Sequence, residues 1–143
     1  MILVTSDPID PVEALRNFMQ GAGEGAAASF VGTVRGSGGV ELLTLDHYPG
    51  FTEKEIAAIV SSLTDRHALT AATVIHRCGP IRPGETLLFA ATAAPRRRAA
   101  LDALDALVEQ LKTDAPFWKK ERRDGTDHWL DAPSVDHSEQ ADA

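Results

Sequence analysis

The sequence predicts an α+β fold, because helical and strand patterns mix along the chain without the strict alternation of a doubly wound protein. Three segments carry apolar residues at helical spacing, and several others carry β-branched or alternating residues. The chain has 143 residues, of which 43% are hydrophobic and 24% charged. This composition is ordinary for a globular protein with a buried core. We expect one domain over residues 1–131.

The first predicted helix begins near Asp10, which is a favourable N-cap residue. Pro11 suits the first helical position, and Glu13 follows three residues after the cap. Gly21 is a plausible end. The expected apolar stripe consists of Leu15, Phe18 and Met19.

Two strands are predicted next, over residues 26–35 and 40–48, with the glycine-rich segment 36–39 as the loop between them. In the second strand, Leu43, Leu45 and His47 alternate and should share one face. A second helix should follow, with residues 52–55 as a capping box. Its stripe consists of Ile56, Ile59, Val60 and Leu63.

Residues 72–77 and 86–93 are predicted to be paired strands, because the segment 79–85 contains the proline and glycine residues of a turn. A long helix should cover about 96–113. Its expected inner stripe consists of Leu101, Leu104, Val108 and Leu111.

A β-hairpin is predicted at the end of the domain. Residues 117–123 and 127–130 should form its strands, with the turn at Asp124-Gly125. From Asp131 onward the chain has four acidic residues and neither lysine nor arginine. We therefore expect residues 132–143 to be a disordered acidic tail.

Several classes of protein are disfavoured by composition. The net charge of −7 argues against a nucleic-acid binder. No apolar run approaches the roughly 20 residues of a membrane span, and the start of the chain lacks a signal-peptide pattern, so we expect a cytoplasmic protein. The single cysteine, Cys78, excludes an internal disulfide and is expected to be structural. The histidines lack ligand spacing, so no metal is expected.

A local basic region interrupts this acidic chain. Residues 95–123 hold eight of the 14 lysines and arginines against five acidic residues. Such a region suits a small anionic ligand better than a polymer. The alternative is a solvated helix face followed by a charged strand, and composition alone favours that alternative.

The junction between the long helix and the hairpin could carry lysine chemistry. Strand alternation places Phe117, Lys119 and Glu121 on one side of the strand. If Phe117 points inward, Lys119 does so too, within reach of Lys112. A second cation and apolar walls favour a neutral lysine, which can act as a nucleophile or general base. Alternatively, Lys112 complements the helix dipole and Lys119 only extends toward water; the residues alone favour this reading.

The segment 112–121, Lys-Thr-Asp-Ala-Pro-Phe-Trp-Lys-Lys-Glu, resembles the signature of the large, catalytic subunit family of molybdopterin synthase. Further similar segments occur in the family's order, namely residues 30–35, 43–50, 74–79 and 83–85. The resemblance runs from about residue 25 to residue 131.

This resemblance implies a sulfurtransferase of molybdenum cofactor biosynthesis with an α/β-hammerhead-like core. Sulfur would pass from the thiocarboxylated C-terminus of a small ubiquitin-like subunit to cyclic pyranopterin monophosphate, forming the molybdopterin dithiolene. The resemblance also implies a homodimer within a heterotetramer. It implies no cofactor, metal, nucleic acid or membrane partner. The alternative function is a non-catalytic or weakly active paralogue that binds the small subunit's C-terminal tail.

The family's two active-site lysines fall on Lys112 and Lys119. Its substrate-binding positions fall on Thr33, Val34, Arg35, Pro95, Arg96, Lys112, Lys119, Lys120 and Glu121. One position departs from the family, because Pro95 stands where a histidine is typical. We expect Arg96, supported by Arg97 or Arg98, to hold the substrate phosphate at a helix N-terminus whose first turn includes Pro95.

Overall fold

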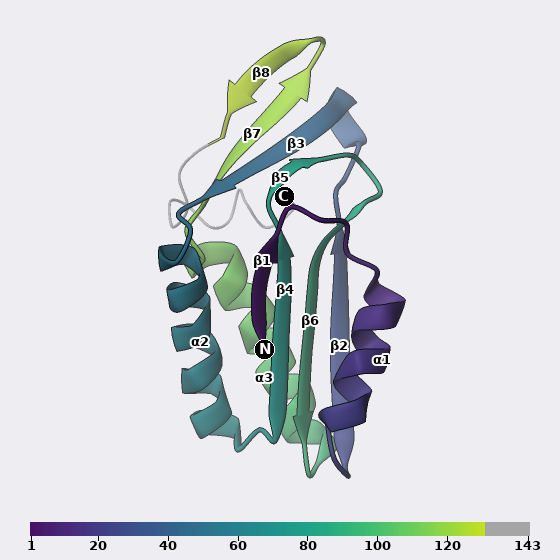
Figure 1. Ribbon diagram of the computed structural model, residues 1–143, viewed down its shortest axis with the longest axis vertical. Coiled ribbons are helices and arrows are strands. Elements are labelled where there is room, and N and C mark those ends of the chain that lie inside the picture. The colour runs from purple at the N-terminus through teal and green to yellow at the C-terminus, as the bar shows by residue number, and fades with distance from the viewer. Residues whose placement is uncertain (131–143) are drawn as a thin grey trace.

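The computed structural model describes residues 1–130, which form two four-stranded sheets and three α-helices (Figure 1). Sheet A contains, in spatial order, β1 (Ile2–Thr5), β4 (Ala71–Arg77), β6 (Thr86–Ala94) and β2 (Ala26–Thr33). Sheet B contains β5 (Gly79–Ile81), β3 (Val40–His47), β7 (Phe117–Arg123) and β8 (Thr126–Trp129). The helices are α1 (Pro11–Gly21), α2 (Phe51–His67) and α3 (Arg97–Asp114). A 3-10 turn, η1 (Ser37–Gly39), precedes β3. The predicted α+β class is confirmed.

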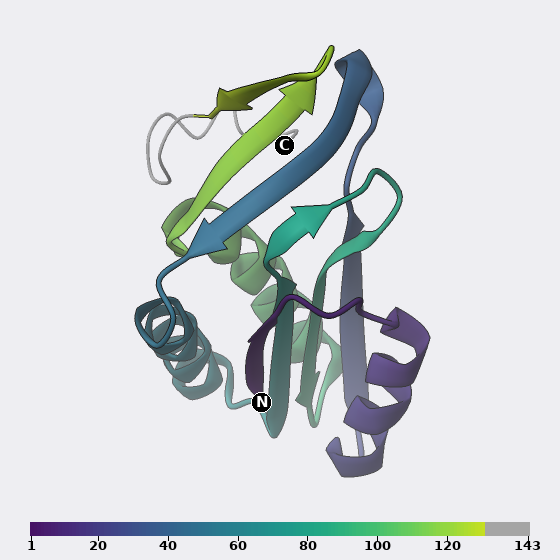
Figure 2. The same cartoon turned by 45° about the horizontal axis from the view of Figure 1, so that its top comes forward.

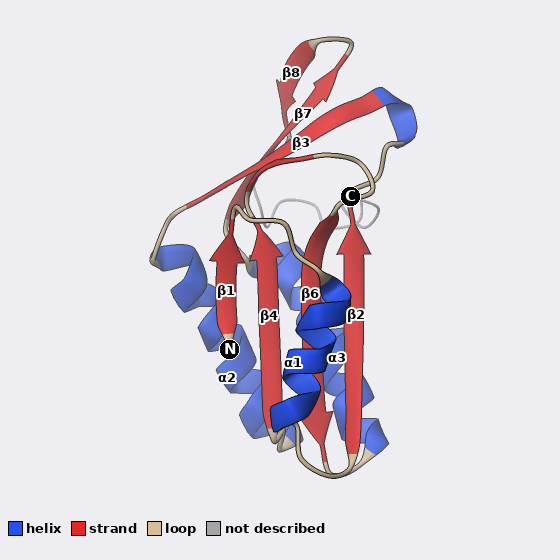
Figure 3. Ribbon diagram, turned by 45° about the vertical axis from the view of Figure 1, so that its right-hand side comes forward, coloured by secondary structure: helices blue, strands red, loops and turns tan. Residues whose placement is uncertain are grey.

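Sheet A is covered on both faces. Helix α1 lies on one face, while α3 lies on the other (Figure 3). Side chains of β6 alternate between these helices: Phe89 packs with Phe18 of α1, whereas Ala94 packs with Ala100 of α3. The small residues of β6 let both helices approach the sheet closely. The predicted pairing of β4 with β6 is confirmed, and it is antiparallel.

Sheet B crosses one end of sheet A, where β3 and β7 run obliquely past the ends of the sheet A strands (Figure 2). The predicted hairpin is confirmed as β7 and β8. Its turn contains Asp124 and Gly125, with φ of 51° and 72°. Positive φ at both positions is typical of a type I′ turn, which matches the twist of the strands it joins.

Two predicted helical stripes need correction. In α1 the Asp10 carboxylate accepts hydrogen bonds from the N–H of Val12 (3.0 Å) and of Glu13 (3.3 Å), so the predicted cap is confirmed. However, α1 buries Ala14 with Phe18, while Leu15 and Met19 are exposed. Helix α3 likewise buries alanines beside leucines; its inner residues are Ala100, Ala103, Leu107 and Leu111. Leu101, expected inside, is 52% exposed. A prediction based on the spacing of large apolar side chains misses a buried helix face on which alanines make the close contacts.

The start of α2 was also predicted two residues late. Gly50, and not Thr52, is the N-cap, and the Glu53 carboxylate accepts a hydrogen bond from the Gly50 N–H at 2.8 Å. Thr52 is fully buried inside the first turn. Its hydroxyl accepts from the Tyr48 N–H at 3.0 Å and donates to the Pro116 carbonyl at 3.1 Å. Thr52 therefore joins α2 to the start of β7.

Strands β1 and β5 were not expected from the sequence. β1 is short and pairs in parallel with β4, so its apolar residues lack a hairpin signal. β5 lies within the segment interpreted as a turn and pairs with β3, placing Gly79 opposite Leu45. The predicted tail, residues 132–143, lies outside the described residues, as does Asp131. Within residues 1–130, no helix is long and apolar enough to cross a membrane.

Candidate active site

Lys119 lies on the inner face of sheet B, as strand alternation predicted. Pro116 follows the end of α3, and the chain enters β7 at Phe117, whose side chain is only 4% exposed. In the antiparallel register of β3 and β7, Leu45 pairs with Lys119, and His47 pairs with Phe117. Partners in this register share a face of the sheet. The stem of Lys119 therefore stands beside buried apolar side chains.

The environment of Lys119 favours its neutral form. Burial lowers the pKa of Lys119, and the positive charge of Lys112 lowers it further, while Glu121 opposes both effects. Lys112 is the last basic residue of α3, so the helix end and the strand bring the two lysines together. Within residues 1–130, no hydrogen-bond acceptor or ion-pair partner of the Lys119 ammonium is found. A lysine with a lowered pKa gives up its proton more readily than an ordinary lysine does.

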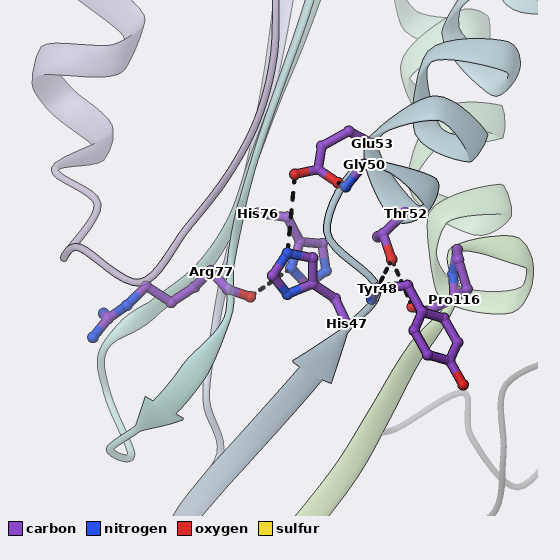
Figure 4. A network of polar contacts seen from close by, with 8 residues as sticks. All are labelled: His47, Tyr48, Gly50, Thr52, Glu53, His76, Arg77 and Pro116. Atoms are coloured by element: carbon purple, nitrogen blue, oxygen red, sulfur yellow. Dashed lines mark hydrogen bonds and ion pairs between the residues drawn. The ribbon is translucent and has the colours of Figure 1, made fainter.

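Two histidines belong to the same region, although neither was predicted to be a site residue (Figure 4). His76 on β4 is buried, and its ring stacks on Phe117 with centroids 4.0 Å apart. Burial lowers the pKa of His76 to about 4; the hydrogen bond to the Arg77 carbonyl opposes this, and Lys119 and His47 add to it. Since a carbonyl only accepts, the Nδ1 atom of His76, 2.9 Å from the Arg77 oxygen, carries the proton. His76 is therefore a neutral imidazole with a fixed tautomer.

His47 is the second histidine and lies between β3 and α2. Its Nε2 atom is 3.9 Å from the Glu53 carboxylate, which also caps α2 (Figure 4). Its ring is tilted against Phe117, with centroids 6.2 Å apart. These histidines look scattered in the sequence, because they come together only where β4 of sheet A packs against β3 and β7 of sheet B, with both rings against Phe117.

Lys120 and Glu121 have partners within the hairpin. The Lys120 ammonium lies 3.9 Å from Asp127 and 5.1 Å from the centroid of the Trp129 ring. Glu121 accepts two hydrogen bonds from the Arg123 guanidinium, at 3.1 and 2.8 Å. Lys120 points to the face opposite Lys119, so only Glu121 of these two shares the Lys119 face.

The predicted substrate-binding stretch at the end of β2 divides into a core residue and two exposed ones. Val34 is buried in the main core, and both its backbone groups are paired, with Glu85 and Gly84. Its side chain therefore fixes the strand end. Thr33 and Arg35 on either side are exposed and accessible to a ligand.

Pro95 and Arg96 lie at the other end of α3. Arg96 is the N-cap and the helix begins at Arg97, so the expectation that Pro95 stands in the first helical turn is wrong. Pro95, Arg96 and Arg97 are all exposed. At a rise of about 1.5 Å per residue, Arg97 and Lys112 are separated by roughly 23 Å along the axis. One chain therefore does not bring the arginines and the lysines together.

Metal-ligand geometry is not found in the part of the chain that the structure describes, where no group of three or more histidine, cysteine or acidic side chains could hold an ion. Cys78 is buried, and burial raises the pKa of its thiol, with Glu53 adding to the effect. These properties fit the structural role expected for this cysteine.

Comparison with known proteins identifies the family. A sequence-family model described as MoaE protein matches residues 4–114 of this chain. The chain belongs to the MoaE family. The molybdopterin synthase catalytic subunit of Caulobacter vibrioides is 38% identical over 141 residues, which cover 97% of this chain and 94% of that protein. The resemblance seen in the sequence is confirmed, and this MoaE chain is an enzyme of the molybdopterin synthase type.

Solved structures agree with this assignment. The molybdopterin biosynthesis MoaE protein of Burkholderia ambifaria superposes with a TM-score of 0.82 and 33% identity, covering 99% of this chain and 96% of that one. A chain from the complex of subunits 1 and 2 of the Helicobacter pylori molybdopterin-converting factor has a TM-score of 0.80 at 20% identity, covering 90% of this chain and 89% of that one. At this identity the second likeness concerns the fold alone.

Proposed function

We propose that this MoaE chain transfers sulfur from the thiocarboxylated C-terminus of a small ubiquitin-like subunit to cyclic pyranopterin monophosphate, forming the molybdopterin dithiolene. The observation that carries the proposal is Lys119, which is mostly buried, has a lowered pKa and stands beside Lys112. We assign Lys112 and Lys119 as the catalytic pair.

The chemistry of the reactants fits these residues. The substrate carries a phosphate and the carrier tail ends in an anion, so the site needs cations. Sulfur transfer also requires a group that protonates leaving oxygens, and a lysine with a lowered pKa can serve as this acid. The buried Cys78 thiol is poorly suited to carry sulfur itself, which is consistent with delivery by a partner.

Substrate binding extends, in this proposal, to residues at both ends of α3, on β7 and at the end of β2. The residues are Thr33, Val34, Arg35, Pro95, Arg96, Lys112, Lys119, Lys120 and Glu121. Val34 contributes by fixing the strand end that carries Thr33 and Arg35. We assign the phosphate to Arg96, supported by Arg97 or Arg98. Because about 23 Å separates the helix ends, Arg96 would reach a Lys112 site from a neighbouring protomer.

A homodimer within a heterotetramer is therefore part of the proposal. The edge strand β2 exposes Phe30 and Val31, and α1 exposes Leu15 and Met19, giving apolar surface for a symmetric interface. Light scattering of the purified chain should report a dimer at micromolar concentration. A monomer would contradict the shared site. A cytoplasmic location stays a prediction.

The decisive experiment is incubation of the purified chain with the pterin precursor and a thiocarboxylated small subunit, with dithiolene formation as the readout. Product formation that is absent from reactions lacking the chain supports the proposal. Pro95 favours a second candidate, a paralogue that captures the carrier tail with little or no turnover. Tight binding of the small subunit without product would support that candidate.

A further inference from the structure

His47 is placed to communicate with Lys119. Because His47 pairs with Phe117 and Leu45 pairs with Lys119, His47 and Lys119 are diagonal neighbours on one face of β3 and β7. Diagonal neighbours have Cβ atoms up to about 7–8 Å apart, which long side chains can bridge. His47 is thus a titratable side chain next to the proposed catalytic lysine.

Glu53 connects His47 to solvent. The His47 side chain is 16% exposed and the Glu53 side chain 35% exposed, with 3.9 Å between Nε2 and the carboxylate oxygen. The carboxylate is held in place because its other oxygen accepts the Gly50 N–H (Figure 4). A carboxylate beside an imidazole orients the ring. The pair therefore lies between bulk water and the buried face.

His76 lies in the same cluster but cannot serve in the same way. Its Nδ1 proton is donated to the Arg77 carbonyl, and burial holds its pKa at about 4. It stays neutral near neutral pH and does not store a proton. The charged and titratable groups near His47 include Glu53 of α2, His76 of β4 and Lys119 of β7; Lys112 of α3 stands next to Lys119, and the Cys78 thiol interacts with Glu53.

We propose that His47, oriented by Glu53, is a relay residue that returns a proton to Lys119 after each transfer step. His47 acts through Lys119 and does not contact the substrate. This role rests on the proposed sulfur transfer and adds to it the route by which the general acid is restored.

The proton balance is simple. The Lys119 ammonium loses a proton to a leaving oxygen of the substrate, so an N–H bond breaks and an O–H bond forms. Protonated His47 then gives its ring proton to the neutral amine, restoring the ammonium. Solvent reprotonates the imidazole beside the partly exposed Glu53 carboxylate. Each cycle takes up one proton from water for each O–H bond formed.

Chemical rescue tests the relay in the assembled synthase. His47→Ala should lower kcat by about ten- to a hundredfold with KM changed less than threefold, because proton transfer contributes about this much or more to turnover. Added imidazole should restore at least a tenth of wild-type kcat, with saturation. His67→Ala, at the far end of α2, is the matched control and should neither lose activity nor respond to imidazole. Glu53→Gln keeps an oxygen for the Gly50 cap and should lower kcat less than His47→Ala does.

The outcomes are separable. Full activity of His47→Ala, or a loss that imidazole leaves unchanged in a folded variant, overturns the relay. If His47→Ala does not fold, His47→Gln replaces it, and unchanged kcat there has the same meaning. A wild-type chain that makes no dithiolene contradicts the proposed function itself.

In that case, a measurement that does not require turnover still tests the relay role of His47. Nitrogen-15 NMR of the histidine side chains should show that Lys119→Met shifts the signals of His47 and His76 but not those of His67. Unshifted His47 signals would overturn the relay whatever the activity of the wild-type chain.

Discussion

The two ends of helix α3 carry similar charges in different environments. At its start, Arg96, Arg97 and Arg98 are exposed, and the ion pair of Arg98 with Asp102 is long, at 3.8 Å. At its end, Lys112 faces Lys119, whose burial lowers its pKa. Positive charge in water is suited to attracting an anion, whereas a desolvated lysine beside another cation can change its protonation state. We therefore propose that the arginine end binds substrate and that the lysine end carries the proton chemistry.

The largest effect should come from the lysine end. Lys112→Ala should abolish dithiolene formation, a loss of at least about a hundredfold, with the fold intact by circular dichroism. Lys119→Arg should also be nearly inactive, although it keeps the charge, because a guanidinium does not give up its proton. Product assays on both variants check this. Near-normal turnover by Lys112→Ala, or by Lys119→Arg, would remove the distinction between the two ends.

The placement of the two lysines at the lysine end could be predicted from the sequence, because it depends on local spacing. Alternation along β7 was sufficient to place Lys119 beside Phe117, and Pro116 marked the junction that brings Lys112 near. The caps and turns that depend on neighbouring residues, such as Asp10 and Asp124-Gly125, were also predictable. These features follow from spacings of a few residues, which a sequence displays directly.

The other features of the site depend on contacts between segments far apart in the sequence, and so they could not be predicted. His47 and His76 meet through the contacts of β3 and β4 with β7, and no spacing rule links them. Thr52 looks like a helix cap, but its hydroxyl bonds to Pro116, 64 residues away. The buried faces of α1 and α3 were predicted wrongly, because alanines that pack closely against β6 are buried there in place of larger side chains. The family resemblance supplied candidate site residues that geometry alone did not, including Arg35.

His76 makes the lysine end sensitive to acid. Its pKa is about 4 in the folded protein against 6.5 in an unfolded chain, so below about pH 6.5 the unfolded state binds more protons. The contribution of His76 to the free energy of unfolding is fully present at neutral pH. It should fall by roughly 2–3 kcal/mol as the pH drops from 6.5 toward 4. Urea unfolding of wild type and His76→Phe at both pH values measures it. An equal loss in the two proteins would exclude His76 as the cause.

Substitutions at the arginine end should weaken substrate affinity more than they lower turnover. Arg96→Ala should weaken precursor binding about ten- to a hundredfold, as expected for the loss of one charged phosphate contact. Saturating substrate should recover most of kcat, unlike the lysine variants. Calorimetric titration at fixed ionic strength, with Arg98→Ala alongside, makes the comparison. If neither variant weakens binding threefold, the phosphate lies elsewhere and Arg35 becomes the better candidate.

The smallest effect is expected for the stability of Arg98→Ala. The Arg98 and Asp102 side chains are 83% and 52% exposed and 3.8 Å apart, so water screens most of their attraction. Arg98 also stands in the first turn of α3, where the helix dipole disfavours a cation. The two effects nearly cancel, and the free energy of unfolding should change by no more than about 0.5 kcal/mol in either direction. Urea denaturation of Arg98→Ala and Asp102→Asn checks this. A loss above about 1 kcal/mol would mean that these charges hold the start of α3 in place. The arginine end would then have a structural role, and its contrast with the lysine end would weaken.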